Sequence, residues 1–225
     1  MRFDQSRELW QNVDQYVVNQ LHLKDPILES ILADANHSGL PEIHVSTCQG
    51  MLLYLLAKSI SAKRILEIGT LAGFSTTYLA RALGPQGKLI TLELDPKHAQ
   101  IARQHLDKNG FSSQVEIKIG PAADSLQSMI NSGEASFDFV FIDADKPGYV
   151  HYIDQLLKLV HSGSMIVADN VIRKGGITDP HSKDENVMGI QRFYERVSNE
   201  PLLEATSIQT VGSKGYDGFY LALVK

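Results

Sequence analysis

The feature that most constrains the fold is a regular alternation of short apolar runs with longer amphipathic segments, which extends from residue 64 to residue 168. The apolar runs have the length of buried strands, and the segments between them place apolar residues at helical spacing. Strands that alternate with helices over short connections form a parallel sheet with helices on both faces, and ligands bind at the carboxyl ends of the strands. The expected strands are 64–68, 88–92, 115–119, 138–142 and 164–168, and the expected helices are 74–83, 96–109, 122–131 and 148–160.

The segments on either side of this alternating core have different patterns. Apolar positions at helical spacing predict N-terminal helices outside the sheet, and a helix and two strands follow a polar loop near the C-terminus. We therefore predict a doubly wound α/β fold with a mostly parallel sheet, in one domain over residues 1–225 with a helical cap at 1–60 and an α/β core at 61–225. The expected flanking elements are helices at 5–21, from Pro26 onward and at 49–60, the loop 173–186, a helix at 187–198, and strands at 203–210 and 217–224.

Composition argues against several classes of protein. The net charge of -5 disfavours a general nucleic-acid-binding protein, which needs a concentrated basic surface. Cys48 is the only cysteine, so neither an intramolecular disulfide nor a cysteine zinc cluster can form. The first residues are too polar for a signal peptide, and no later apolar run reaches the length of a membrane span. We expect a cytoplasmic protein that binds neither nucleic acid nor a membrane.

The stretch from residue 64 to residue 83 combines a buried strand, a turn from Gly69 to Gly73 and a helix. A glycine turn lets a ligand approach the backbone, and the helix start offers free N–H groups, so the stretch is typical of a nucleotide-binding cradle. An ordinary strand-to-helix connection is the alternative. Glu93 lies 20 residues after Gly73, where doubly wound folds place an acid against the ribose hydroxyls of an adenosine cofactor. Its alternative role is to cap the helix that begins at Pro96, which Asp95 can also do.

Polar residues follow the fourth and fifth expected strands of the core. If these strands are neighbours, Asp143, Asp169 and Asn170 bring three oxygen ligands together at one edge of the sheet. Oxygen ligands without cysteine or histidine suit Mg²⁺, Ca²⁺ or Mn²⁺ rather than zinc. Each residue alone could instead serve an Asx turn or a helix cap. Together they favour a divalent-cation site, with Mg²⁺ as the first choice.

Lys146 lies three residues after Asp143, on the loop beside the expected metal site. An amine that is partly desolvated near a dication loses its proton more readily, so Lys146 is a candidate general base. A solvated surface lysine is the alternative. The histidines show no metal-binding spacing, and only His44 and His181 are candidates for contacts with a substrate. Neither a GxSxG motif nor a Walker phosphate loop occurs in the sequence, which disfavours serine hydrolases and P-loop enzymes.

Five sequence blocks follow one another as EIGTLAGFS, LELD, GPAADSL, FIDADK and ADNV. In order and spacing they resemble the cation-dependent O-methyltransferase family, which includes catechol and caffeoyl-coenzyme A O-methyltransferases and many bacterial relatives. The resemblance extends from about residue 43 to residue 225, and FIDADK with ADNV is far more selective than a glycine turn. It implies a class I methyltransferase sheet of seven strands, the last antiparallel, that binds S-adenosylmethionine.

The resemblance also implies roles for individual residues. Lys146 matches the lysine regarded as the base, and Asp143 lies beside it as a metal ligand. The implied acceptor is a small aromatic with adjacent hydroxyls, of the catechol, caffeoyl or flavonoid type, and the implied assembly is a homodimer. The residues assigned to the cofactor are Val45, Ser46, Glu67, Gly69, Thr70, Gly73, Ser75, Glu93, Leu94, Ala122 and Asp143, and those assigned to the metal are Asp143, Asp169 and Asn170.

Two other functions are compatible with parts of this pattern. A nicotinamide-dependent dehydrogenase would share the ribose acid, but it would need the full GxGxxG motif, of which only Gly69 and Gly73 are present. A non-catalytic S-adenosylmethionine-binding protein would be expected to have lost Lys146 or a metal ligand, and all are present. Where catechol methyltransferases carry a glutamate shortly before the final Asp-Gly turn, this chain has Val211 and Gly212. A divalent-metal-dependent O-methyltransferase is therefore the expected function.

Overall fold

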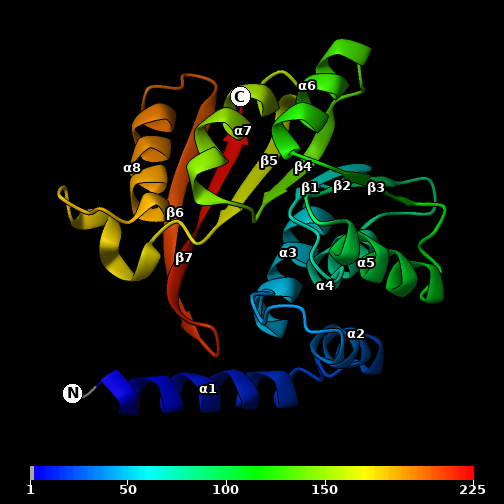
Figure 1. Ribbon diagram of the computed structural model, residues 1–225, viewed down its shortest axis with the longest axis vertical. Coiled ribbons are helices and arrows are strands. Elements are labelled where there is room, and N and C mark those ends of the chain that lie inside the picture. Colours follow the sequence, from blue (N-terminus) through cyan, green and yellow to red (C-terminus); the bar gives the residue numbers. More distant parts are fainter. Residues whose placement is uncertain (1–2) are drawn as a thin grey trace.

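The computed structural model describes residues 3–225, whose centre is a seven-stranded sheet (Figure 1). Its strands are β1 (Arg64–Ile68), β2 (Lys88–Glu93), β3 (Val115–Ile119), β4 (Phe137–Ile142), β5 (Val160–Asp169), β6 (Leu203–Gly212) and β7 (Gly215–Val224). The order across the sheet is β3-β2-β1-β4-β5-β7-β6. Strands β1 to β5 run parallel, and β7 is antiparallel to both of its neighbours. The predicted doubly wound fold with one antiparallel last strand is confirmed.

Both faces of the sheet are covered by helices. One face packs against α3 (Thr47–Ser59), α4 (Phe74–Ala82) and α5 (Pro96–Lys108), and the other packs against α6 (Ala122–Ser132), α7 (Tyr149–Leu156) and α8 (Glu185–Ser198). Successive side chains of a strand point to opposite faces. In β4, Phe139 and Phe141 pack in the core beneath α3, α4 and α5, while Val140 and Ile142 pack in the core beneath α6, α7 and α8. A strand buried on both faces needs an unbroken apolar sequence, which is why the core strands could be predicted.

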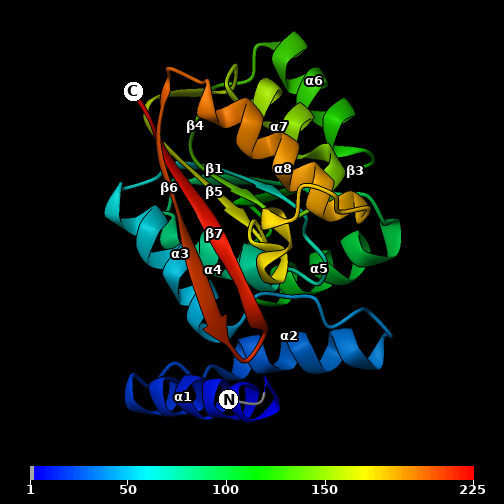
Figure 2. The same cartoon turned by 90° about the vertical axis from the view of Figure 1, so that its left-hand side faces the viewer.

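The two N-terminal helices, α1 (Phe3–Gln20) and α2 (Pro26–His37), lie beyond one end of the sheet (Figure 2). Asp25 caps α2 by accepting a hydrogen bond from the Ile27 N–H (2.9 Å), and it also pairs with Arg81 of α4 at 2.5 Å. The turn of the β6–β7 hairpin reaches α1, where the Ser213 N–H donates to the Asp14 carboxylate at 2.7 Å. Within residues 3–225, no helix is both long enough and apolar enough to cross a membrane.

Two predicted boundaries were wrong. Helix α7 ends at Leu156 rather than residue 160, and β5 begins at Val160 rather than residue 164. The strand starts early because Val160 pairs with Phe137, and an irregularity in register then accommodates the polar residues that follow. The predicted polar loop 173–186 contains a short 3₁₀ segment, η2 (Arg173–Thr178), before α8 begins at Glu185.

Candidate active site

The turn after β1 forms the predicted cradle. Gly69 has a φ of +103° and Gly73 a φ of +84°, and a Cβ atom on Gly69 would collide with the backbone carbonyl of Asp143. Glycine therefore allows the ends of β1 and β4 to lie against each other. Gly73 is also the N-cap of α4, and no side chain caps that helix. The first N–H groups of α4 are consequently free to face a ligand.

Glu67 is fully buried in β1 and connects three elements of the cradle. Its carboxylate accepts hydrogen bonds from Ser75 Oγ (2.6 Å), Thr76 Oγ1 (2.5 Å) and Thr91 Oγ1 (2.7 Å). Burial raises the pKa of Glu67 to about 7, although these hydroxyls oppose the shift. The predicted cofactor residues Glu67 and Ser75 are therefore in direct contact, and a carboxyl group that titrates near neutral pH lies beneath the cradle.

Glu93 ends β2 and holds the turn of the cradle in place. Its Oε2 accepts hydrogen bonds from the backbone N–H groups of Thr70 (3.2 Å) and Leu71 (2.8 Å), and its Oε1 accepts one from Asp95 (2.9 Å). Asp95, in turn, caps α5 through the Lys97 N–H. The helix cap considered for Glu93 is thus supplied by its neighbour, and the ribose role of Glu93 stays a prediction.

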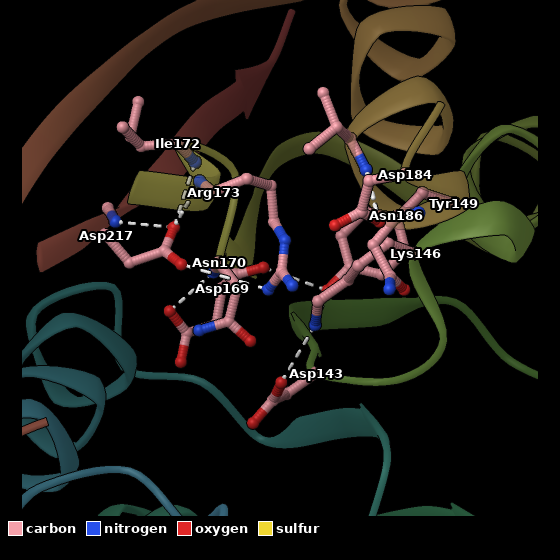
Figure 3. Close-up of polar contacts among 12 residues, drawn as sticks. Asp143, Lys146, Tyr149, Asp169, Asn170, Ile172, Arg173, Asp184, Asn186 and Asp217 are labelled. Carbon is pink, nitrogen blue, oxygen red and sulfur yellow. Dashed lines mark hydrogen bonds and ion pairs between the residues drawn. The ribbon is translucent and has the colours of Figure 1, made fainter. Parts of the chain in front are cut away.

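The carboxyl ends of β4 and β5 bring the predicted metal ligands and Lys146 together (Figure 3). The strands are parallel neighbours with Ile142 paired to Ala168, so the residues that follow them meet at one edge. Lys146 Nζ donates hydrogen bonds to Asp143 Oδ1 (3.1 Å) and to the Tyr149 hydroxyl (2.9 Å). The Tyr149 hydroxyl lies 3.0 Å from the backbone carbonyl of Asp169. One continuous polar network therefore joins Asp143, Lys146 and Asp169.

The electrostatics of this network fit a bound cation. Burial and the negative charge of Asp143 raise the pKa of Asp169 well above its usual range, although the Lys146 ammonium opposes this shift. Asn170 has a φ of +58° and donates its backbone N–H to Asp169 Oδ1, so its side chain starts from a constrained backbone. The described residues contain no cluster of three or more His, Cys, Asp or Glu side chains suited to a metal ion. The assignment of Asp143, Asp169 and Asn170 to a cation therefore stays a prediction.

The environment of Lys146 differs from the one expected for a base. Its burial favours the neutral amine, but Tyr149, Asp143 and Asp169 outweigh burial and raise the pKa of Lys146. Beside Tyr149 and these two carboxylates, the lysine is an ammonium group at neutral pH. It is buried rather than solvated, with 7% of its side chain exposed, so the alternative of a surface lysine is wrong.

The remaining predicted residues have varied surroundings. Val45 is buried, and Ser46 begins α3 in a capping box with Gln49. Leu94 has 69% of its surface exposed just after β2, and Ala122 is the first residue of α6. These positions are compatible with contacts to a cofactor, but nothing in the geometry of the protein alone tests them.

The two candidate histidines lie in different environments. His44 packs its ring 5.2 Å from that of Phe74, and its Nε2 lies 3.4 Å from Nζ of Lys214 in the β6–β7 turn. Burial lowers the pKa of His44. His181 is exposed on the loop after η2. The first therefore borders the cradle helix α4, whereas the second makes no side-chain contact that would assign it a role.

Three further polar residues at this edge were missed by sequence reasoning. Tyr149 holds Lys146, Arg173 begins η2, and Asp217 accepts the backbone N–H groups of Ile172 and Arg173 at 2.9 and 3.0 Å. The signal that could have found Asp217 is its Asp-Gly pair, a sequence typical of turns, which here lies within β7. No periodicity marks Arg173, because it lies in an irregular loop.

A cavity of about 370 Å³ separates the N-terminal helices from the cradle. Its walls come from α1, α2, the start of α3 and the β6–β7 turn, and they include Asp14, Leu28, Ser46, Phe74 and Ser213. The cavity thus adjoins two elements that carry predicted cofactor residues, the first turns of α3 and α4. The carboxylates at the ends of β4 and β5 do not line it.

Parallel strands β1 to β5, an antiparallel β7 and a glycine cradle opposite an acidic edge define an α/β methyltransferase fold. A family model described as O-methyltransferase matches residues 19–224. Catechol O-methyltransferase of Mycobacterium tuberculosis is 48% identical over 214 residues, which cover 95% of this chain and 96% of that protein. Catechol O-methyltransferase of Niastella koreensis is 44% identical over 220 residues, with coverages of 98% and 100%. The chain belongs to the O-methyltransferase family.

A solved structure supports the same assignment. The O-methyltransferase from Bacillus cereus, crystallised in complex with SAH, matches with a TM-score of 0.95 at 47% identity, over 97% of this chain and 100% of that one. The predicted family, fold and enzyme class are therefore confirmed. The comparisons do not test the predicted site residues, the metal or the acceptor.

Proposed function

We propose that this protein transfers a methyl group from S-adenosylmethionine to one hydroxyl of a small aromatic with two adjacent hydroxyls, and that the reaction requires a divalent cation, Mg²⁺ first. The observation that carries the proposal is the pair of neighbouring carboxylates, Asp143 and Asp169, which lie with Lys146 at the edge next to the cradle, where burial and Asp143 raise the pKa of Asp169. The relatives named catechol O-methyltransferase and the SAH complex of the Bacillus cereus protein support it.

The cradle would hold the methyl donor. Gly69 opens the backbone to the ligand, Ser75 presents its hydroxyl at the start of α4, and Glu93 keeps the turn in shape while one edge of its carboxylate meets the ribose. S-adenosylmethionine supplies a methyl group on a positively charged sulfur, so the acceptor needs only a properly placed oxygen nucleophile. The other proposed contacts are Val45, Ser46, Glu67, Thr70, Gly73, Leu94, Ala122 and Asp143.

Asp143, Asp169 and Asn170 would hold the cation. A divalent cation supplies positive charge that stabilises an ionised hydroxyl and fixes the position of its oxygen. This contribution matters because the first ionisation of a catechol resembles that of tyrosine, with a pKa of about 10. The protein's own part is to keep the buried Asp169 and the partly buried Asp143 close together, which costs folding free energy unless positive charge neutralises them.

Lys146 would take the proton from the acceptor hydroxyl at Nζ. Tyr149 and the proposed metal ligands Asp143 and Asp169 raise its pKa, so a cation bound to the carboxylates would offset their part of this shift. Burial, which favours the neutral amine, acts in the same direction as that cation. Tyr149 keeps Nζ directed toward Asp143 through a hydrogen bond of 2.9 Å.

The proposal is tested by incubating the protein with S-adenosylmethionine and caffeic acid or another catechol, in Mg²⁺ and then in chelator. We expect methylation only with the metal, and equal methylation in chelator would refute the metal requirement. Asp143→Asn should weaken Mn²⁺ binding measured by electron paramagnetic resonance. Asp154→Asn, which removes an exposed carboxylate from α7, is the matched control and should bind Mn²⁺ as the wild type does.

We also propose that the protein forms a homodimer through an apolar surface on α1, α3 and β6. Helix α1 contacts both α3 and β6, and the exposed apolar side chains of these three elements are Leu9, Val13, Tyr16, Leu52, Leu55, Ile208 and Val211. Exposed apolar side chains on neighbouring elements favour burial against a second copy. Light scattering after gel filtration measures the mass, and a monomer at micromolar concentration would refute the proposal.

The cytoplasmic location stays a prediction.

A further inference from the structure

Arg173 lies three residues after Asn170 and directs its side chain back to the acidic edge of the sheet. Figure 3 shows the guanidinium extending between Asp169 and Asn170 on one side and Lys146 on the other. The side chain is 28% exposed, so it is neither part of the core nor free in solvent. A cation therefore borders the place where the proposed acceptor would bind.

The guanidinium of Arg173 has few polar partners among the described residues. Its Nε is buried without a hydrogen-bond partner, and among residues 3–225 no acceptor receives a hydrogen bond from the guanidinium. The nearest carboxylate oxygen is Asp217 Oδ2, at 3.9 Å from Nη1, which is too long for a hydrogen bond. The guanidinium therefore has N–H donors that no acceptor in the described part of the chain satisfies, among them a buried one at Nε.

The Asp217 carboxylate binds mainly backbone groups rather than the Arg173 side chain. Its Oδ1 accepts three backbone N–H groups, from Ile172 (2.9 Å), Arg173 (3.0 Å) and Gly218 (3.0 Å). These bonds attach the start of η2 to the β7 strand. Asp217 thus anchors the backbone of Arg173, while its other oxygen makes only a long ion pair of 3.9 Å with the guanidinium.

The backbone that carries Arg173 is strained. Arg173 has a φ of +51° and Lys174 a φ of +55°, which are left-handed conformations that non-glycine residues rarely adopt. Each costs about 1 kcal/mol or more, and such strain persists only where surrounding contacts hold it, often at ligand sites. Here the hydrogen bonds to Asp217 hold the conformation, and it is this conformation that directs Arg173 toward the site.

A guanidinium of this kind suits a carboxylate. Its planar fork binds the two oxygens through parallel hydrogen bonds, and a partly desolvated site strengthens them. Figure 3 shows the guanidinium of Arg173 beside Asp169 and Asn170, at the edge where the hydroxyls of the acceptor would bind. A carboxylate that reaches it would therefore be carried on the aromatic ring or on a short side chain. The phosphates of a coenzyme A ester lie much farther from its aromatic ring and fit less well.

We propose that Arg173 is an acceptor-binding residue that pairs with a carboxylate carried by a catechol, so that the preferred acceptors are catecholic acids rather than neutral catechols. The inference rests on the proposed function and narrows its substrate class. It assigns Arg173 to specificity, with no part in proton transfer.

The test compares 3,4-dihydroxybenzoate with its methyl ester, which has the same two hydroxyls but no charge. For the wild type and Arg173→Gln, kcat/KM is measured with both acceptors. We expect Arg173→Gln to lower kcat/KM for the acid by about tenfold to a hundredfold, the range for one hydrogen-bonded charge pair, and to change the ester by less than about twofold. Arg173→Lys should restore part of the loss through its charge. Lys118→Gln, which removes a positive charge from β3 at the far edge of the sheet, should change neither acceptor.

Calorimetric titration of both compounds into the protein loaded with SAH and Mg²⁺ separates this inference from the proposed function. Arg173→Gln should raise the Kd of the acid and leave that of the ester unchanged. An equal change in both compounds, or no change in either, would show that Arg173 is only structural and would overturn the inference. If the wild type methylates neither compound, the proposed function fails, and the two Kd values still decide whether the carboxylate subsite exists.

Discussion

The buried carboxyl group of Glu67 predicts a stability that depends on pH in a defined direction. Burial raises its pKa to about 7 from an ordinary value of 4.5, so the folded protein holds this proton more tightly than the unfolded chain does. Stability from this proton is fully present below pH 4.5 and is lost as the pH rises through about 7. Replacing Glu67 by Gln removes the titrating group and should remove this part of the pH dependence.

The magnitude follows from the two pKa values. Each pKa unit corresponds to about 1.36 kcal/mol, so the difference between 4.5 and about 7 sets a ceiling of roughly 3.4 kcal/mol. Between pH 5 and pH 8, where both states are easily measured, the contribution of Glu67 should fall by about 2.5 kcal/mol. That is a large fraction of the stability of an ordinary domain.

The assay is urea unfolding of the wild type and Glu67→Gln at pH 5 and pH 8, with the free energy of unfolding extrapolated to water. The difference between the two proteins should change by about 2.5 kcal/mol between the two pH values, in favour of Glu67→Gln at pH 8. Thr76→Val removes one hydrogen bond that stabilises the carboxylate, so it should enlarge the loss of stability at high pH. A difference between wild type and Glu67→Gln that is the same at both pH values would refute the reasoning.

Three other substitutions test separate parts of the structure. Gly69→Ala should lower the free energy of unfolding by about 2–5 kcal/mol, because its Cβ meets the Asp143 carbonyl. The control is Gly133→Ala, at a position with a φ of +69° but open space around it. It should lower the free energy of unfolding by only about 1–2 kcal/mol in the same urea assay. Tyr149→Phe frees Lys146 and should reduce kcat about tenfold, with a shifted pH profile of kcat and a stability loss of only about 1 kcal/mol. Asp14→Ala detaches α1 from the β6–β7 turn and should lower Tm by about 2–4 °C while speeding amide exchange at Ser213; unchanged exchange there would contradict it.

The core of the fold could be predicted because its physical requirements are local. Strands β1 and β4 are buried on both faces, so their sequences are mostly apolar, and the amphipathic segments that alternate with the core strands indicate helices that connect parallel strands. The boundary at β5 could not be predicted in the same way. Residues His161 to Ser164 are polar or small, and they extend because Val160 pairs with Phe137 and the Ser164 hydroxyl hydrogen-bonds the Phe137 carbonyl. Such pairing depends on a neighbouring strand rather than on the segment's own composition.

The candidate site also contains some features that the sequence predicts and others that depend on tertiary contacts. Asp143 and Asp169 end buried parallel strands, so topology alone predicted that they would meet. The protonation state of Lys146 could not be predicted from the sequence, because its pKa depends on the balance between its burial and three neighbouring polar groups. The buried Tyr149 was missed because it begins α7, where an aromatic residue at helical spacing indicates core packing and not a hydrogen bond to Lys146.

Arg173 was missed for a different reason, which bears on how acceptors are selected in this fold. The residue that sets its conformation, Asp217, lies 44 positions later in the sequence and comes near only because β7 pairs antiparallel with β5. The groups proposed for methyl transfer follow the parallel strands, whereas the group proposed for acceptor choice is held by the one strand that runs in the opposite direction. Substitutions in β7 and η2 can therefore alter which acceptor binds without moving Asp143 or Asp169. Asp217→Asn, which keeps the shape of the side chain but weakens its three backbone hydrogen bonds, should accordingly reduce the preference for 3,4-dihydroxybenzoate over its ester while Mn²⁺ binding stays unchanged, and a loss of Mn²⁺ binding in this variant would contradict that separation.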